Sequence, residues 1–154
     1  MLEAKPRSWF SWDYRVLDAG REVGGFNLAW LREGGALLVG AEKCPVRREG
    51  LWGDWILDWR GREVARATKP SSWSRRFLVR FGGREIELVP PHVFTRSFAA
   101  REGGRTVGEI APAGIFTRRT RIDLPSDVPL PVQVFMLFLV ILMWRRAAQS
   151  SDSG

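Results

Sequence analysis

The chain has 154 residues, which favours a single domain with a hydrophobic core of its own. Its net charge of +7, mostly from arginine, favours an anionic partner: lipid headgroups, nucleic acid or an acidic protein. The single cysteine, Cys44, excludes an internal disulfide, and the first residues lack the apolar stretch of a secretion signal, so we expect a cytoplasmic protein.

Residues 1–13 form an aromatic and basic segment that we place before the main domain. Trp9, Phe10 and Trp12 lie close in sequence to Arg7. Aromatic and basic side chains together suit the headgroup level of a membrane, which would make this segment a short interfacial anchor. The alternative is that its aromatic side chains pack on the surface of the main domain.

From Tyr14 to Asp123, short apolar runs alternate with turns that contain glycine. Two-residue turns such as Gly82-Gly83 are typical of β-hairpins. The runs predict about ten strands, at residues 14–18, 21–27, 36–42, 54–59, 62–69, 75–81, 84–89, 93–100, 105–111 and 115–123. Because no helix separates these strands, they predict an antiparallel barrel or sandwich.

A repeated phrase supports the predicted hairpins. Its four copies are Gly20-Arg21-Glu22-Val23, Gly61-Arg62-Glu63-Val64, Gly83-Arg84-Glu85-Ile86 and Gly104-Arg105-Thr106-Val107. In three copies the next residue is small: Gly24, Ala65 or Gly108. A small residue lets a strand lie close to a bulky neighbour, and we expect that neighbour to be the C-terminal helix.

An uncharged stretch from Val132 to Trp144 predicts a helix at about residues 130–146. Its apolar residues fall on every side, so the helix must be buried in protein or in a membrane. About 13 apolar residues span roughly 20 Å, whereas bilayer hydrocarbon is about 30 Å thick. This length favours a helix inside the domain; a C-terminal membrane anchor is the alternative. The side chains expected in the core are Val134, Phe135, Leu137, Phe138, Val140, Ile141, Leu142 and Trp144.

The order of these features resembles the Tubby C-terminal-like superfamily, which includes phospholipid scramblases and LURP-one-related proteins. The resemblance lies in two turn-and-strand phrases, Asp58 to Val64 and Gly104 to Ile110, and in the proline-rich phrase from Ile122 to Pro131. It covers about residues 14–146, which leaves 147–154 as a disordered tail. The resemblance implies a closed barrel of twelve strands with the helix through its middle.

The predicted fold class is therefore mainly β: a closed antiparallel β-barrel of about 10–12 strands around a hydrophobic C-terminal helix. Residues for catalysis are few, because His92 is the only histidine and lies in a proline-containing loop. Scramblases of eukaryotes bind calcium through an acidic segment before the helix. Here that region offers only Asp123 and Asp127, whereas calcium takes about six to eight oxygen ligands. We expect no enzyme activity, no metal and no cofactor.

A basic patch is the best candidate site. Arg75-Arg76 and Arg118-Arg119 follow aromatic residues at equivalent positions of the internal repeat, so we expect them at the same rim of the barrel. Each basic residue near an anionic membrane contributes about 1 kcal/mol to binding. The alternative is a solvated face of paired arginine and glutamate side chains. The residues assigned to the patch are Arg66, Arg75, Arg76, Arg118, Arg119 and Arg121.

These features predict a non-enzymatic scramblase-like or Tubby-like domain that binds or senses anionic phospholipid. It would be cytoplasmic and associated peripherally with a membrane surface. The alternative is an integral membrane protein anchored by the helix at about residues 130–146. The sequence leaves open whether the protein also binds a protein partner. We do not expect nucleic-acid binding, because the aromatic residues alternate as core residues do and no RNA-binding phrase is present.

Overall fold

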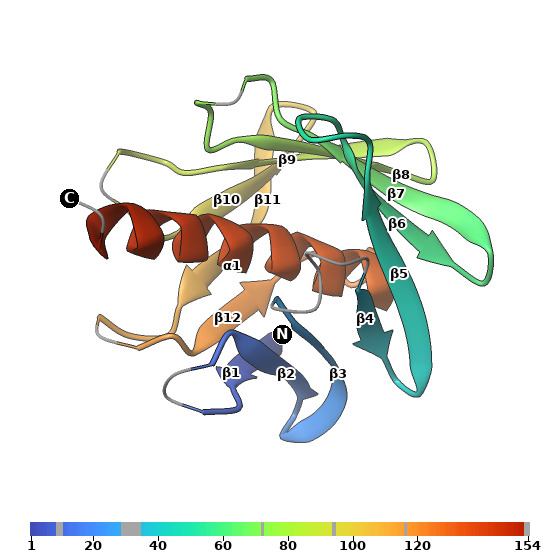
Figure 1. Ribbon diagram of the computed structural model, residues 1–154, viewed down its shortest axis with the longest axis horizontal. Helices are drawn as coiled ribbons and strands as arrows, with labels where there is room; N and C mark the ends of the chain where they lie inside the picture. The colour runs from blue at the N-terminus through green and yellow to red at the C-terminus, as the bar shows by residue number, and fades with distance from the viewer. Residues whose placement is uncertain (9–10, 29–34, 72, 94, 116, 153–154) are drawn as a thin grey trace.

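The computed structural model describes residues 1–8, 11–28, 35–71, 73–93, 95–115 and 117–152. Within these residues, twelve antiparallel strands pair in chain order, and the first closes the barrel by pairing with the last. Helix α1 (Leu130–Asp152) runs through the middle of the barrel (Figure 1). The predicted fold class, a closed antiparallel barrel around a hydrophobic C-terminal helix, is confirmed.

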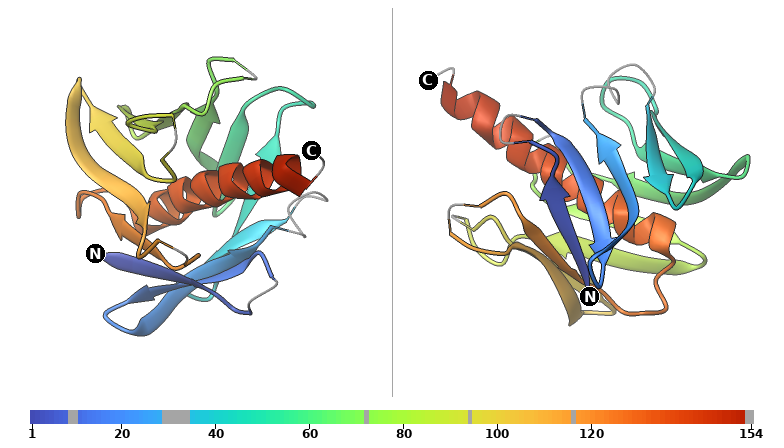
Figure 2. Two further views of the ribbon diagram at one scale, coloured as in Figure 1. Left: turned by 90° about the vertical axis from the view of Figure 1, so that its left-hand side faces the viewer. Right: turned by 90° about the horizontal axis from the view of Figure 1, so that it is seen from below.

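The strands form one layer that surrounds the helix in both views of Figure 2. Buried and exposed side chains alternate along most of them, because successive residues of a strand point to opposite faces. The strands are β1 (Leu2–Pro6), β2 (Asp13–Asp18), β3 (Arg21–Asn27), β4 (Ala36–Val39), β5 (Glu42–Arg48), β6 (Trp55–Trp59), β7 (Arg62–Thr68), β8 (Phe77–Phe81), β9 (Arg84–Val89), β10 (Phe98–Glu102), β11 (Arg105–Pro112) and β12 (Thr120–Asp123).

Two of these strands, β1 and β5, are absent from the predicted set. β1 lies in the segment that we placed before the domain, yet it pairs with both β2 and β12. The predicted boundary after residue 13 is therefore wrong, and the barrel begins at Leu2. β5 contains Pro45, which argues against a strand interior because proline lacks a backbone N–H. The residues on either side of it, Cys44 and Val46, are nevertheless buried in the core.

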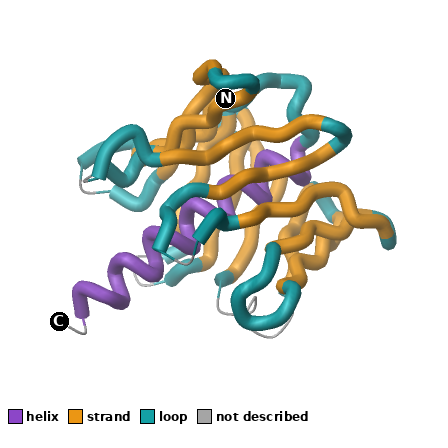
Figure 3. The backbone as a smooth tube through the Cα atoms, turned by 90° about the horizontal axis from the view of Figure 1, so that it is seen from above, coloured by secondary structure: helices purple, strands orange, loops and turns teal. Residues whose placement is uncertain are grey.

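The two ends of the barrel differ in the length of their connections. At the short-turn end, two-residue turns lie at 19–20, 40–41, 60–61, 82–83 and 103–104, and residues 124–129 lead into α1. At the long-loop end, the connections are residues 7–12, 28–35, 49–54, 69–76, 90–97 and 113–119. α1 begins at the short-turn end, and its last turns project beyond the strands at the long-loop end (Figure 3).

The repeated phrase forms four of the short turns. Ala19 and Gly20 have φ angles of 49° and 80°, and Arg60 and Gly61 have φ angles of 52° and 74°. Positive φ at both central residues is the type I′ turn, whose twist matches that of the flanking strands. The other two copies place glycine at both positions, with φ between 52° and 79°.

Three copies of the phrase continue into a β-bulge. The residue without a partner is Val23, Val64 or Val107, because the register shifts by one residue at each of these places. The fourth copy pairs without a bulge, and its Ile86 is fully buried, whereas Val107 is 37% exposed. The bulged valines are thus less buried than Ile86, although Val23 and Val64 still pack against the edge of the core.

At two of the three bulges, the small residue after the bulge faces the next strand and not the helix. A Cβ on Gly24 would overlap the backbone carbonyl oxygen of Leu38 in β4. A Cβ on Gly108 would overlap the carbonyl oxygen of Asp123 in β12. The prediction that the C-terminal helix is the close neighbour is therefore wrong, since the backbone of the adjacent strand occupies that space.

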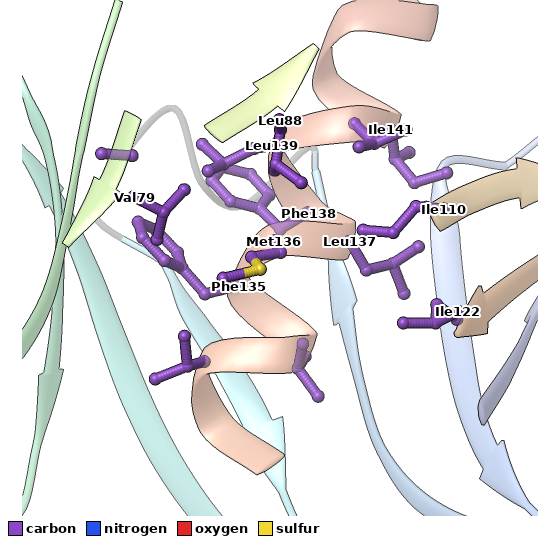
Figure 4. Close-up of a cluster of buried hydrophobic side chains, with 14 of the residues drawn as sticks. Val79, Leu88, Ile110, Ile122, Phe135, Met136, Leu137, Phe138, Leu139 and Ile141 are labelled. Atoms are coloured by element: carbon purple, nitrogen blue, oxygen red, sulfur yellow. The ribbon is translucent and has the colours of Figure 1, made fainter. Parts of the chain in front are cut away.

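The apolar part of α1 fills the core. Figure 4 shows Leu137 on the side of the helix that faces Ile110 and Ile122, and Phe135 on the side that faces Val79. Because strands surround the helix, its apolar residues need no single stripe. Of the residues predicted to pack in the core, Leu142 is half-buried and the others are buried: Val134, Phe135, Leu137, Phe138, Val140, Ile141 and Trp144.

The helix continues beyond its predicted end at Arg146. Residues 147–152 are exposed helix, so the predicted disordered tail is wrong for them, and residues 153–154 lie outside the described residues. By length and composition α1 could cross a membrane, but 72% of its most apolar window is buried inside the barrel. A buried core helix passes the same test of length and composition.

Candidate functional site: the long-loop end

Exposed large apolar side chains gather at the long-loop end. Its connections contribute Leu51, Trp52, Trp73, Val93 and Ile115, which are between 78 and 95% exposed. Elsewhere in the described chain, such side chains are Met1, Leu38 and Val107, and the last two are only 40% and 37% exposed. Single exposed apolar residues are ordinary, but a group of them at one end of a molecule indicates a contact surface.

Three of the long connections contain the same tripeptide, an aromatic residue followed by serine or threonine and then arginine. In each copy the hydroxyl oxygen accepts a hydrogen bond of 3.0 Å from the backbone N–H two residues further on. This bond closes a local turn just before the next strand begins. The copies are Trp73-Ser74-Arg75, Phe94-Thr95-Arg96 and Phe116-Thr117-Arg118, of which Phe94 and Phe116 lie outside the described residues.

The three arginines of these tripeptides, the arginine series, connect neighbouring long loops. Each guanidinium group donates two hydrogen bonds to backbone carbonyl oxygens in the next long connection around the barrel. The bonds run from Arg75 to Val93 and Thr95 at 2.8 and 2.7 Å, from Arg96 to Ile115 and Thr117 at 3.3 and 2.8 Å, and from Arg118 to Ser11 and Ser8 at 2.6 and 3.1 Å.

Each member of the series also lies over an aromatic ring. The guanidinium carbon is 5.8 Å from the ring centre of Phe98 for Arg75, 4.8 Å from Trp144 for Arg96 and 5.1 Å from Trp12 for Arg118. Trp144 belongs to α1, and its indole N–H donates a hydrogen bond of 2.9 Å to the carbonyl oxygen of Arg96. The series therefore fixes the loops to the helix at the point where the helix leaves the barrel.

Two hollows lie beside α1 at this end. The first hollow has a volume of about 390 Å³ and lies between α1 and the connection 49–54, with Leu28, Arg48, Phe138, Leu142 and Arg146 among its lining residues. The second hollow has a volume of about 460 Å³ and lies beside the arginine series, with Trp12, Arg96, Arg118, Met143 and Trp144 among its lining residues. A further hollow of about 530 Å³ lies at the short-turn end, beside Trp59 and Pro131.

Arg48, Lys69 and Arg146 form a basic cluster beside the first hollow. Arg48 and Arg146 line both this hollow and a smaller one of about 110 Å³, which Lys69 also lines. Burial lowers the pKa of all three groups, and Arg146 and Arg48 lower the pKa of Lys69 further by charge repulsion. No carboxylate of the described residues contributes to the pKa shift of Arg48 or Arg146. An anion would therefore relieve repulsion within the cluster.

The arginines predicted to form one patch fall into two groups. Arg75 and Arg118 belong to the arginine series, and Arg119 is exposed and forms no ion pair with a described residue. Three others pair with carboxylates: Arg66 with Glu49, Asp54 and Glu63, Arg76 with Glu87, and Arg121 with Glu109. Their positive charge is thus balanced locally on the wall of the barrel.

The predicted site omits Arg48, Arg96 and Arg146. Arg96 had a signal in the sequence, a further copy of the tripeptide, but the prediction rested on only two copies, those that contain Arg75 and Arg118. Arg48 ends β5, which the strand prediction lacks. Arg146 follows the apolar helix in sequence, but its place beside Arg48 depends on how the barrel closes around that helix.

Comparison of the chain with protein-family models, with curated proteins and with solved structures finds no match. In the part of the chain that the structure describes, no group of three or more His, Cys, Asp or Glu side chains is placed to hold a metal ion. The long-loop end therefore offers positive charge and apolar contact as its chemistry.

Proposed function

We propose that the protein is a non-enzymatic, peripheral membrane protein that binds anionic phospholipid with the long-loop end of its barrel. The observation that carries the proposal is the coincidence of exposed Trp52 and Trp73 with the basic residues Arg48 and Arg146 at one end. Tryptophan is favoured at the membrane–water interface, and guanidinium groups bind phosphate oxygens through paired hydrogen bonds.

The distribution of ion pairs supports this orientation. Toward the short-turn end, Arg60 pairs with Glu42 at 2.6 Å and Arg80 pairs with Glu85 at 2.7 Å. Exposed pairs of this kind add little stability, but they cancel charge. Because these carboxylates are paired away from the long-loop end, they do not neutralise Arg48 and Arg146, whose positive charge an anionic surface attracts.

In this proposal α1 stays inside the barrel. Phe135, Leu137 and Phe138 are fully buried, and withdrawal of the helix into a bilayer would expose the apolar inner face of the strands. An integral protein anchored by α1 is the competing function. Carbonate washing of membranes distinguishes the two, since it removes a peripheral protein and leaves an anchored one behind.

Vesicle sedimentation with the full chain tests the proposal. We expect binding to vesicles that contain phosphatidylserine, weak binding to phosphatidylcholine alone, and loss of binding at high salt. The double variant Trp52→Ala/Trp73→Ala should bind roughly tenfold more weakly or worse, because both side chains lose their place at the interface. Leu38→Ala/Val107→Ala, which removes apolar side chains from the wall, is the matched control and should bind as the unsubstituted protein does.

Two results would overturn the proposal. One is the absence of binding to anionic vesicles at low salt. The other is equal binding by the tryptophan double variant and the wall control, since the contact surface would then lie elsewhere on the molecule.

A further inference from the structure

The first hollow joins an apolar wall to a positively charged rim. Leu51, from the connection 49–54, and Leu142, from α1, give the hollow its accessible apolar wall, and the buried side chains of Leu28 and Phe138 lie beneath it. Leu142 is half-buried although its neighbours in the helix are buried, so α1 presents apolar surface to this space. With a volume of about 390 Å³, the hollow is within the range of small-molecule sites, about 300–1,000 Å³.

Two elements supply the rim. Arg48 comes from β5 and Arg146 from α1, and both side chains line the first hollow and the smaller one beside it. The guanidinium carbon of Arg48 lies 4.5 Å from the ring centre of Trp55, which also lines both hollows. The indole N–H of Trp55 is buried and has no acceptor among the described residues. The rim thus contains three donor groups, two guanidinium groups and one indole N–H, and the described residues that line the two hollows include no carboxylate.

We propose that the first hollow binds a monoacyl anion, a single acyl chain that ends in a carboxylate or phosphate group. The chain lies against Leu51 and Leu142, and the oxyanion lies between Arg48 and Arg146. Carboxylate and phosphate oxygens both accept paired hydrogen bonds from guanidinium groups. The headgroup therefore separates two like charges, while the chain covers the apolar wall.

Simpler ligands would interact either with the charged rim or with the apolar wall, but not with both. A small inorganic anion would neutralise the rim but leave the apolar wall in water. An uncharged chain would cover the wall but leave the repulsion between Arg48 and Arg146 in place, since neither forms an ion pair with a carboxylate of the described residues. The inference goes beyond the proposed membrane contact, because it concerns one dissolved ligand molecule and can be tested without vesicles.

Titration calorimetry on the full chain tests the inference. The probes are laurate and monododecyl phosphate below their micelle-forming concentrations, with dodecanol as the uncharged control and acetate as the control without a chain. We expect one saturable site for at least one of the two anions, with dodecanol at least about tenfold weaker and acetate without measurable binding. The tighter of the two anions identifies the headgroup.

Variants locate the site. Arg48→Gln/Arg146→Gln should lower the affinity for the preferred anion by at least about tenfold. Arg62→Gln/Arg105→Gln is the charge-matched control, because both arginines are exposed at the short-turn end and neither forms an ion pair with a described residue. Trp73→Ala removes a side chain of the membrane contact that does not line the hollow, and it should leave the affinity unchanged.

The inference is overturned by any of three results: no saturable binding of either anion, equal affinity for dodecanol and the anions, or unchanged affinity in the Arg48/Arg146 variant. Thermal unfolding shows whether that variant is folded, and the dodecanol comparison on the unsubstituted protein does not depend on it. Failure of the membrane proposal gives a different pattern, since vesicle binding would then be absent while the anion still binds.

Discussion

Gly108 lies where β11 bulges beside β12, and the carbonyl oxygen of Asp123 occupies the space that a side chain would need. Gly24 has the same relation to Leu38. At the third bulge the residue is Ala65, whose Cβ is accommodated in the core. The sequence repeat predicted the need for a small residue, but only the pairing of the strands shows which neighbour imposes it.

We expect Gly108→Ala to lower the free energy of unfolding by about 1–3 kcal/mol, because β12 must move to admit the methyl group. Ala65→Gly is the matched control, and its effect should stay within about 1 kcal/mol, which reflects backbone entropy and one lost methyl group. Urea unfolding measures both. If Gly108→Ala is as stable as the unsubstituted protein, the close contact between β11 and β12 is not a constraint.

Tyr14 is a second residue with a measurable consequence. Its hydroxyl is buried and has no hydrogen-bond partner among the described residues. Burial raises the pKa of Tyr14 to about 12, and the positive charges of Arg118 and Arg96 oppose this shift. An unfolded tyrosine has a pKa of about 10, so the folded state holds the proton more tightly. The contribution to stability is complete below about pH 10 and is lost as the pH rises toward about 12.

To test this effect, the free energy of unfolding is measured with denaturant at about pH 9 and about pH 11 for the unsubstituted protein and for Tyr14→Phe. Between these values the unsubstituted protein should lose more stability than the variant, and the difference approaches roughly 2–3 kcal/mol by about pH 12. At neutral pH the variant should be nearly as stable, because the hydroxyl makes no bond in the described chain. Parallel loss of stability in both proteins would contradict the assigned cause.

At the scale of elements, α1 has two parts with different roles. Residues 131–144 supply the centre of the core, where Phe138 packs edge-to-face against Phe26 and Trp55 with ring centres 5.9 and 5.6 Å apart. Residues 147–152 are exposed and lie beyond the strands. The composition of the helix predicted the buried part, but its polar last turns look like a tail in sequence because no apolar stripe marks them as helical.

Two truncations should separate these parts. A chain that ends at Arg146 should fold with nearly the same stability, within about 1 kcal/mol, since only exposed helix is removed. A chain that ends at Pro129 should aggregate, because the inner faces of all strands lose the apolar side chains that cover them. Size-exclusion chromatography and thermal unfolding give the comparison. A soluble, folded chain ending at Pro129 would mean that the barrel does not need its central helix.

At the scale of the whole molecule, the barrel and its helix could be predicted, and the grouping of charges could not. Alternation, hairpin turns and a helix apolar on all sides are local patterns, so they are visible in the sequence. Whether an arginine meets a carboxylate depends on strand register: Arg84 lies 2.9 Å from Glu102 because β9 and β10 are neighbours. The clusters around Arg48 and Arg96 likewise form between loops that are distant in sequence, so they depend on which strands are neighbours in the barrel.

The position of α1 after all twelve strands has a consequence for synthesis. A ribosome releases the chain from its first residue onward, so the strands emerge before the helix that fills their centre. Until α1 has been synthesised, the inner faces of the strands have no apolar partner. The barrel also stays open until β12 is available to pair with β1. Such exposed strand edges and apolar faces are aggregation-prone. We therefore expect folding of this barrel during synthesis to depend strongly on a chaperone or on rapid synthesis of α1. A protein whose core residues are synthesised early should depend less on either.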